Sequence, residues 1–122
     1  MRSERAEAAL LAIQLHGREA QVFLDGVSRD AFRQDRRTFH AVTRCLEIIS
    51  EATRRLPEPL KARHSHLPWR DIADAGNVYR HEYDNVAADF VFKTSKADLP
   101  LLLAAVEQEL RRSPLEPDHI GG

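Results

Sequence analysis

The repeated spacing of apolar residues in steps of three and four is the feature that most limits what this chain can fold into. In the first stretch, the small or apolar residues that recur in this way are Ala6, Leu10, Ile13, Gly17, Ala20 and Leu24. That spacing places them on one face of an α-helix. Ser3 is a suitable N-cap and Gly26 a suitable terminator, so the pattern predicts a helix from about Glu4 to Leu24.

The same spacing predicts two further long helical segments. The first covers residues 35–56, and its expected core face comprises Ala41, Val42, Cys45, Ile48, Ile49, Ala52 and Leu56. The second covers residues 86–112, and its expected core face comprises Phe90, Leu99, Leu102, Leu103, Val106 and Leu110. Pro100 should kink or divide this second segment near residues 96–99, because proline interrupts helical hydrogen bonding.

The connections between these segments are short. Ser28 should cap one short helical turn, and Pro57 and Pro59 should end the central helix. The sequence lacks the sustained alternation of apolar and polar residues that would predict a strand. The sequence therefore predicts an all-α fold, an antiparallel bundle of four to five helices, with one domain over residues 1–112 and a flexible tail over 113–122.

The charge and the cysteine and histidine content of the chain argue against several classes of function. The net charge of −1 gives no global attraction to nucleic acid or to an anionic membrane. A single cysteine, Cys45, excludes an internal disulfide framework and lies among apolar neighbours, so we interpret it as a buried structural thiol. His64 and His66 lack nearby cysteines or carboxylates, and we expect them to be solvated rather than to bind zinc. We expect a cytoplasmic protein without metal or cofactor.

Residues 67–84 combine an apolar and a polar face. If residues 69–84 form one continuous helix after Pro68, five polar side chains fall within an arc of roughly 80°. They are Arg70, Asp74, Asn77, His81 and Asp84. The opposite side carries Ile72, Tyr79 and Tyr83. This polar face is the candidate functional site.

A second polar stripe follows the central helix and comprises Arg37, His40, Arg44, Glu47 and Glu51. It has two interpretations. The first, which we favour, is a water-facing surface with ion pairs along the helix. The second places part of the stripe across a cleft from His81.

Three segments together carry a family resemblance. They are Leu-Glu-Ile-Ile-Ser-Glu-Ala at 46–52, Pro-Trp-Arg-Asp-Ile-Ala at 68–73, and Asn-x-x-x-His-x-Tyr at 77–83. Their order and spacing resemble the HepT-like branch of the HEPN superfamily over nearly the whole chain.

That resemblance implies a homodimeric helical bundle and a metal-independent endoribonuclease that cleaves RNA at a dimer cleft. It also implies the toxin half of a bacterial toxin–antitoxin pair, whose partner is a minimal nucleotidyltransferase (MNT). In the family this antitoxin transfers AMP to the tyrosine of the His-x-Tyr element, which is Tyr83 here.

The sequence departs from the family motif at one position. The motif has an arginine separated from its histidine by four to six intervening residues, but the permitted positions hold Gly76, Ala75 and Asp74. We therefore expect His81 to act as the acid or base, Asn77 to orient it or the scissile phosphate, and Arg80 to replace the missing cation.

Two alternatives remain open at this point. Arg70 is a weaker candidate than Arg80 for binding phosphate. The alternative function is a catalytically impaired HEPN-fold module that serves as a binding partner of an MNT-type nucleotidyltransferase.

Overall fold

Helices make up the regular structure of the chain. The computed structural model describes residues 2–77 and 85–112, and within these ranges it contains no strand. The elements are α1 (Glu4–Leu24), α2 (Arg29–Gln34), α3 (Arg36–Arg54), α4 (Glu58–Arg63), α5 (Trp69–Ala75), α6 (Asn85–Lys93), a π-helix η2 (Thr94–Asp98) and α7 (Leu99–Arg111). The predicted all-α bundle is confirmed. None of the described helices has an apolar stretch that could cross a membrane.

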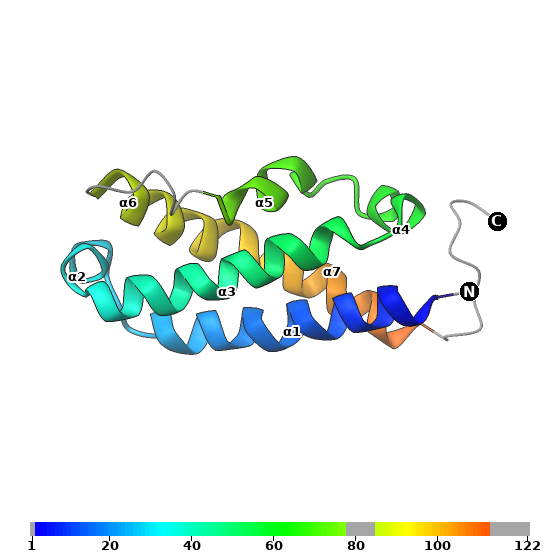
Figure 1. Cartoon of the computed structure of the whole chain (residues 1–122), viewed down its shortest axis with the longest axis horizontal. Helices are drawn as coiled ribbons and strands as arrows, with labels where there is room; N and C mark the ends of the chain where they lie inside the picture. The colour runs from blue at the N-terminus through cyan, green and yellow to red at the C-terminus, as the bar shows by residue number, and fades with distance from the viewer. Residues whose placement is uncertain (1, 78–84, 113–122) are drawn as a thin grey trace.

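The two long helices α1 and α3 lie side by side and antiparallel, with α7 packed against α1 (Figure 1). α1 begins at Ser3, whose hydroxyl accepts a hydrogen bond from the Ala6 N–H at 3.0 Å. It ends before Gly26, which has a φ of +73°, a conformation that favours glycine. Both predicted ends of this helix are confirmed.

The core face of α3 is wider than the periodicity predicted. Phe39, Leu46 and Ser50 are buried in addition to most of the predicted face, whereas Ala41 and Ile48, which were predicted to be core residues, are only half-buried. The difference has a simple cause, because α3 packs against α1 on one side and against α5 on another. The buried arc therefore extends beyond a single stripe.

The short helix α2 is attached through an aromatic cluster and an ion pair. The ring of Phe32 lies 5.9 Å from that of Phe39 and 5.6 Å from that of Phe92. Arg33 donates two hydrogen bonds, of 2.8 and 2.5 Å, to the two carboxylate oxygens of Asp89 on α6. These contacts connect α2 to both α3 and the last part of α6.

The helix after residue 85 is divided just before Pro100, as predicted. In the π-helix, the Leu99 N–H donates to the Thr94 carbonyl, five residues earlier. This wider turn lies directly before Pro100, which has no N–H and whose ring would clash with the carbonyl four residues back in a regular helix. The prediction for Phe90 was wrong: its side chain is 40% exposed, because Ala87, Ala88 and Val91 form the buried face of α6.

A buried carboxylate lies between α4 and α7. Glu109 is 2% exposed; Arg63 donates to it at 2.7 and 3.2 Å, and His64 Nε2 lies 2.7 Å from Oε2. The expectation that His64 is solvated was therefore wrong, since its imidazole is buried against this carboxylate. Burial alone would raise the pKa of Glu109, but the hydrogen bonds from Arg63 and His64 outweigh burial and lower it.

Replacing Glu109 with glutamine should destabilise the fold by about 3 kcal/mol, because the charge of a buried, hydrogen-bonded ion pair is removed from one side only. Urea unfolding at pH 7 measures the effect.

The lowered pKa of Glu109 means that the native carboxylate contributes stability above its ordinary pKa of 4.5. That contribution is lost as the pH falls through the lower native pKa, so the difference between the wild type and Glu109→Gln should shrink in acid.

The matched control is Glu107→Gln, the same chemical change on the same helix. Glu107 pairs with Arg18 at the surface. Its replacement should change the free energy of unfolding by no more than about 0.5–1 kcal/mol. Equal effects of the two substitutions would show that the buried network adds nothing beyond an ordinary surface pair.

Candidate active site

The segment that carries the family motif begins on α5 and continues beyond it. α5 ends at Ala75 with Gly76 as its C-cap, and Asn77 follows in a turn. The expected continuous helix over residues 69–84 was therefore wrong at Gly76 and Asn77. Arg80, His81 and Tyr83 lie outside the described residues, so their predicted roles stay predictions.

The start of α5 is positioned by α4. The indole Nε1 of Trp69 donates to the carbonyls of Lys61 and His64, at 3.1 and 3.0 Å. Ile72 then packs into the core. The indole thus adds a second hydrogen bond to two carbonyls at the end of α4, which also accept from the backbone N–H groups of His64 and Leu67.

The end of α5 is positioned by α3 through one buried hydroxyl. Ser50 is 4% exposed, and its Oγ donates to the Ile72 carbonyl at 2.8 Å. The same oxygen accepts a hydrogen bond from the Gly76 N–H at 3.0 Å. One side chain of α3 therefore binds both a carbonyl in α5 and the first N–H after it.

Gly76 lies so close to α3 that a side chain there would require the neighbouring atoms to shift. A Cβ at this position would lie 3.0 Å from the Glu47 Cα and 3.0 Å from the Ser50 Oγ. The first of these is a backbone atom and cannot move aside cheaply. Position 76 is where the family motif would begin with arginine, and this contact gives a structural reason for the glycine.

Arg54 on α3 is the cationic side chain beside the turn at Gly76 and Asn77. Its Nη2 donates to the Ala73 carbonyl at 2.9 Å, and weaker ion pairs join it to Glu51 at 3.6 Å and Asp74 at 4.0 Å. Its side chain is about half exposed. The guanidinium therefore retains access to solvent while its position is fixed by α5.

These residues enclose a polar hollow of about 130 Å³ between α3 and the end of α5. Its lining residues are Glu47, Ser50, Glu51, Arg54, Ala73, Gly76 and Asn77. Asn77, which the motif singles out, is thus placed beside carboxylates and a guanidinium from α3. We take this hollow as the candidate active site.

The groups in the hollow are suited to proton transfer and to binding of a polar substrate. Glu47 is three-quarters buried and offers a carboxylate that can accept a proton. The guanidinium of Arg54 can donate hydrogen bonds to a phosphate, and the carboxylates of Glu47 and Glu51 beside it offset part of its positive charge.

The second polar stripe lies largely at the surface, and its placement across a cleft from His81 stays a prediction because His81 is outside the described residues. Glu47 and Glu51 line the hollow, whereas Arg37, His40 and Arg44 are exposed. Arg70 is exposed on the first turn of α5 and is absent from the lining of the hollow. Sequence reasoning missed the roles of Ser50 and Arg54. Ser50 belongs to the 46–52 segment but received no role there, Arg54 belongs to no motif, and both act through contacts more than 15 residues away.

Comparison with known proteins identifies relatives over most of the chain. The profile of the "Ribonuclease HepT-like" family matches residues 13–109. A protein of Thermococcus cleftensis named "Probable ribonuclease HepT" is 38% identical over 77 residues, which is 63% of this chain and 70% of the relative. No solved structure matches.

Two further relatives are named as putative RNases. One, from Caldanaerobacter subterraneus subsp. tengcongensis, is 33% identical over 71% of this chain and 78% of its own length. The other, from Methanocaldococcus jannaschii, is 26% identical over 73% of this chain and 74% of its own length.

Introducing arginine at position 76 should damage the fold, whereas arginine at position 74 should not. Gly76→Arg forces a side chain against the α3 backbone and should cost at least about 2 kcal/mol of unfolding free energy. Asp74→Arg adds the same side chain at an exposed position that the motif spacing also permits, and should cost less than about 1 kcal/mol. Urea unfolding of both variants measures the difference. Equal stability would contradict the close contact at Gly76.

Proposed function

The chain belongs to the ribonuclease HepT-like family, and from this premise we propose that it is a metal-independent endoribonuclease. We further propose that it is the toxin component of a bacterial HEPN/MNT-type toxin–antitoxin pair, acting in the cytoplasm. The single observation that best supports catalysis is the hollow at the end of α5. There Asn77 of the family motif lies with a three-quarters-buried carboxylate, Glu47, and with the guanidinium of Arg54.

Cleavage of RNA without metal needs a base for the 2′-hydroxyl, an acid for the leaving 5′-oxygen and a cation for the charged phosphorane. We assign the acid–base role to His81, because imidazole gains and loses protons near neutral pH. Asn77 orients His81 or the scissile phosphate. Arg80 supplies the cation in place of the motif arginine, with Arg70 as a weaker candidate.

The reaction transfers two protons and needs both a base and an acid, whereas each subunit supplies one motif histidine. Two subunits that meet would supply both. We therefore propose a homodimer in which two copies of His81 face a common cleft. An exposed apolar stripe on α1 supports self-association: Leu11, Leu15 and Val22 are 49%, 58% and 72% exposed and lie within about 40° of one another around the helix.

The proposed protein partner is an MNT-type nucleotidyltransferase antitoxin. Tyr83 belongs to the His-x-Tyr element of the family motif, and we propose that this phenol is where the antitoxin attaches AMP. Modification two residues from His81 would introduce a phosphate and a nucleoside beside the acid–base group and so block RNA binding.

A second function is favoured by one specific observation. None of the three positions that the motif permits holds arginine, and a side chain at position 76 would press against α3, so catalysis depends on another cation. A chain in which no other cation takes that role would be a catalytically impaired HEPN-fold module that binds the nucleotidyltransferase without cutting RNA.

The test of the main proposal is RNA cleavage by the purified chain in the presence of EDTA. We expect His81→Ala to lower the cleavage rate by at least about 100-fold, because general acid–base catalysis contributes on that scale. His66→Ala, at an exposed histidine outside the hollow, is the matched control and should cleave like the wild type. Equal cleavage by His81→Ala and wild type would remove His81 from the mechanism. Absence of cleavage by the wild type itself would favour the binding module.

The choice of cation is tested by comparing two arginine variants in the same assay. Arg80→Ala should lower the rate by at least about tenfold more than Arg70→Ala, since Arg80 is adjacent to His81 and Arg70 lies on the first turn of α5. The opposite ranking would assign the phosphate contact to Arg70.

A further inference from the structure

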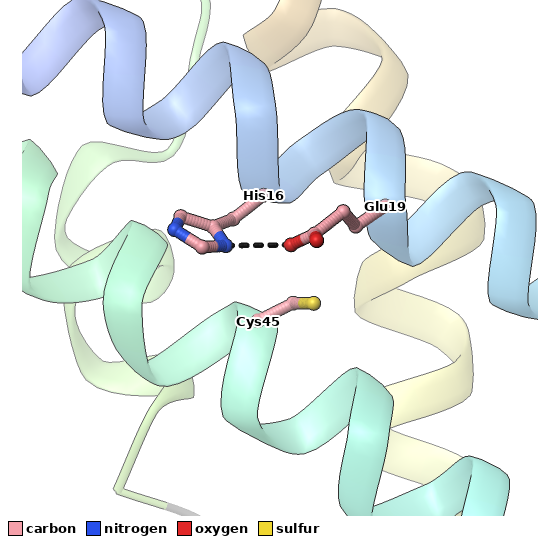
Figure 2. A group of neighbouring side chains, drawn as sticks. All are labelled: His16, Glu19 and Cys45. Atoms are coloured by element: carbon pink, nitrogen blue, oxygen red, sulfur yellow. Dashed lines mark hydrogen bonds and ion pairs between the residues drawn. The ribbon is translucent and has the colours of Figure 1, made fainter.

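Three side chains with metal-binding atoms converge between α1 and α3. His16 and Glu19 come from α1, one turn apart, and Cys45 comes from α3 (Figure 2). One imidazole nitrogen, one carboxylate oxygen and the thiol sulfur all lie within 4.8 Å of one another. His16 Nδ1 and Glu19 Oε1 already form a hydrogen bond of 2.7 Å.

The cluster formed by these three side chains is buried on the Cys45 side and open to solvent on the side of His16 and Glu19. Cys45 is 4% exposed, whereas the side chains of His16 and Glu19 are 25% and 46% exposed. An ion between them would have the sulfur beneath it and solvent above it. It would reach this position past His16 and Glu19 without opening the core.

The separations are close to those that a tetrahedral zinc ion requires. Zinc–ligand bonds of about 2.0–2.3 Å place neighbouring ligand atoms about 3.3–3.7 Å apart. Donor atoms at most 4.8 Å apart therefore need to approach by about 1 Å, which small side-chain rotations provide while the two helices stay packed. The ion would replace the hydrogen bond between His16 and Glu19.

The donor set also selects the type of metal. A thiolate with an imidazole favours zinc and similar transition metals, whereas magnesium and calcium prefer oxygen ligands alone. We propose that His16, Glu19 and Cys45 bind one Zn²⁺ ion per chain, with water as the fourth ligand, and that this ion cross-links α1 to α3.

Binding requires one change of protonation. Burial, with a smaller contribution from Glu19, raises the pKa of the Cys45 thiol to about 11. Zinc therefore binds as the thiol releases its proton to solvent, while His16 binds as neutral imidazole and Glu19 as carboxylate.

The site is separate from the proposed ribonuclease site. Cys45 and Glu47 are two residues apart on α3, so they point about 160° away from each other, the first toward α1 and the second into the hollow. The ion would stabilise the helix pair and take no part in cleavage. The experiment below is therefore independent of whether the chain cuts RNA, and of the EDTA assay.

Cobalt(II) is the probe that reports thiolate binding directly. The reduced full chain, without a histidine tag or chelator, is titrated with Co²⁺. We expect one Co²⁺ per chain, visible absorption typical of four-coordinate cobalt, and a near-ultraviolet thiolate-to-cobalt charge-transfer band. Cys45 is the one cysteine of the sequence, so that band can come from no other residue. Added Zn²⁺ should displace the cobalt and raise the Tm by about 5–10 °C at a concentration about 100-fold above its Kd.

Three variants separate this site from adventitious binding. Cys45→Ala should abolish the charge-transfer band, and His16→Ala and Glu19→Gln, both at the surface, should weaken Co²⁺ binding by at least about tenfold. His40→Ala, at an exposed histidine on α3, is the matched control and should bind like the wild type. If Cys45→Ala does not fold, the two surface variants still decide the question. Absence of the charge-transfer band in the wild type, or undiminished binding by His16→Ala and Glu19→Gln, would overturn the proposal.

Discussion

The backbone of Gly76 lies directly against α3, and the geometry of the candidate active site depends on this contact. Because a Cβ would meet the Glu47 backbone at 3.0 Å, glycine at position 76 lets α5 approach α3 this closely without displacing that backbone. The approach allows the Ser50 hydroxyl to bond to both Ile72 and Gly76. It also brings Asn77 to the same hollow as Glu47 and Arg54. The glycine at position 76 and the formation of the hollow therefore depend on the same packing contact.

Most of the fold could be predicted from the sequence because its determinants are local. Ser3 caps α1 through the N–H three residues later, and Gly26 terminates it with its own positive φ. Pro100 divides its helix because of its own missing N–H. The end of α5 could not be predicted in this way, since it depends on a hydroxyl 26 residues earlier in the chain. The burial of His64 likewise depends on Glu109, 45 residues later.

The candidate site was accessible to sequence reasoning only in part. The motif identified Asn77, and helical periodicity placed Glu47 and Glu51 on one stripe. All three residues line the hollow. Ser50 lies in the 46–52 segment and Arg54 in no motif, but neither could be assigned a role, because a serine or arginine in a helix gives no indication of what it contacts. Arg80, His81 and Tyr83 lie outside the described residues. The roles of His81 and Tyr83 rest on the family motif, and that of Arg80 rests on its place next to His81 in the sequence.

Position 45 shows a different limit of sequence reasoning. Its apolar neighbours correctly indicated a buried thiol. They could not indicate that His16 and Glu19, on another helix, lie above it. A buried cysteine beneath a surface imidazole and carboxylate has a possible chemistry that the same cysteine inside a purely apolar core would lack.

The two ends of α5 are held by different parts of the molecule, and this has a consequence for variants far from the hollow. A helix of seven residues is too short to be stable alone, so its position is set entirely by its neighbours. Trp69 ties its start to α4, and α4 is in turn held to α7 through Glu109. A substitution at the α4–α7 junction can therefore tilt α5 and alter the placement of Asn77 without touching any group in the hollow. Loss of activity in such a variant would result from displacement of α5, and would not identify the substituted residue as catalytic.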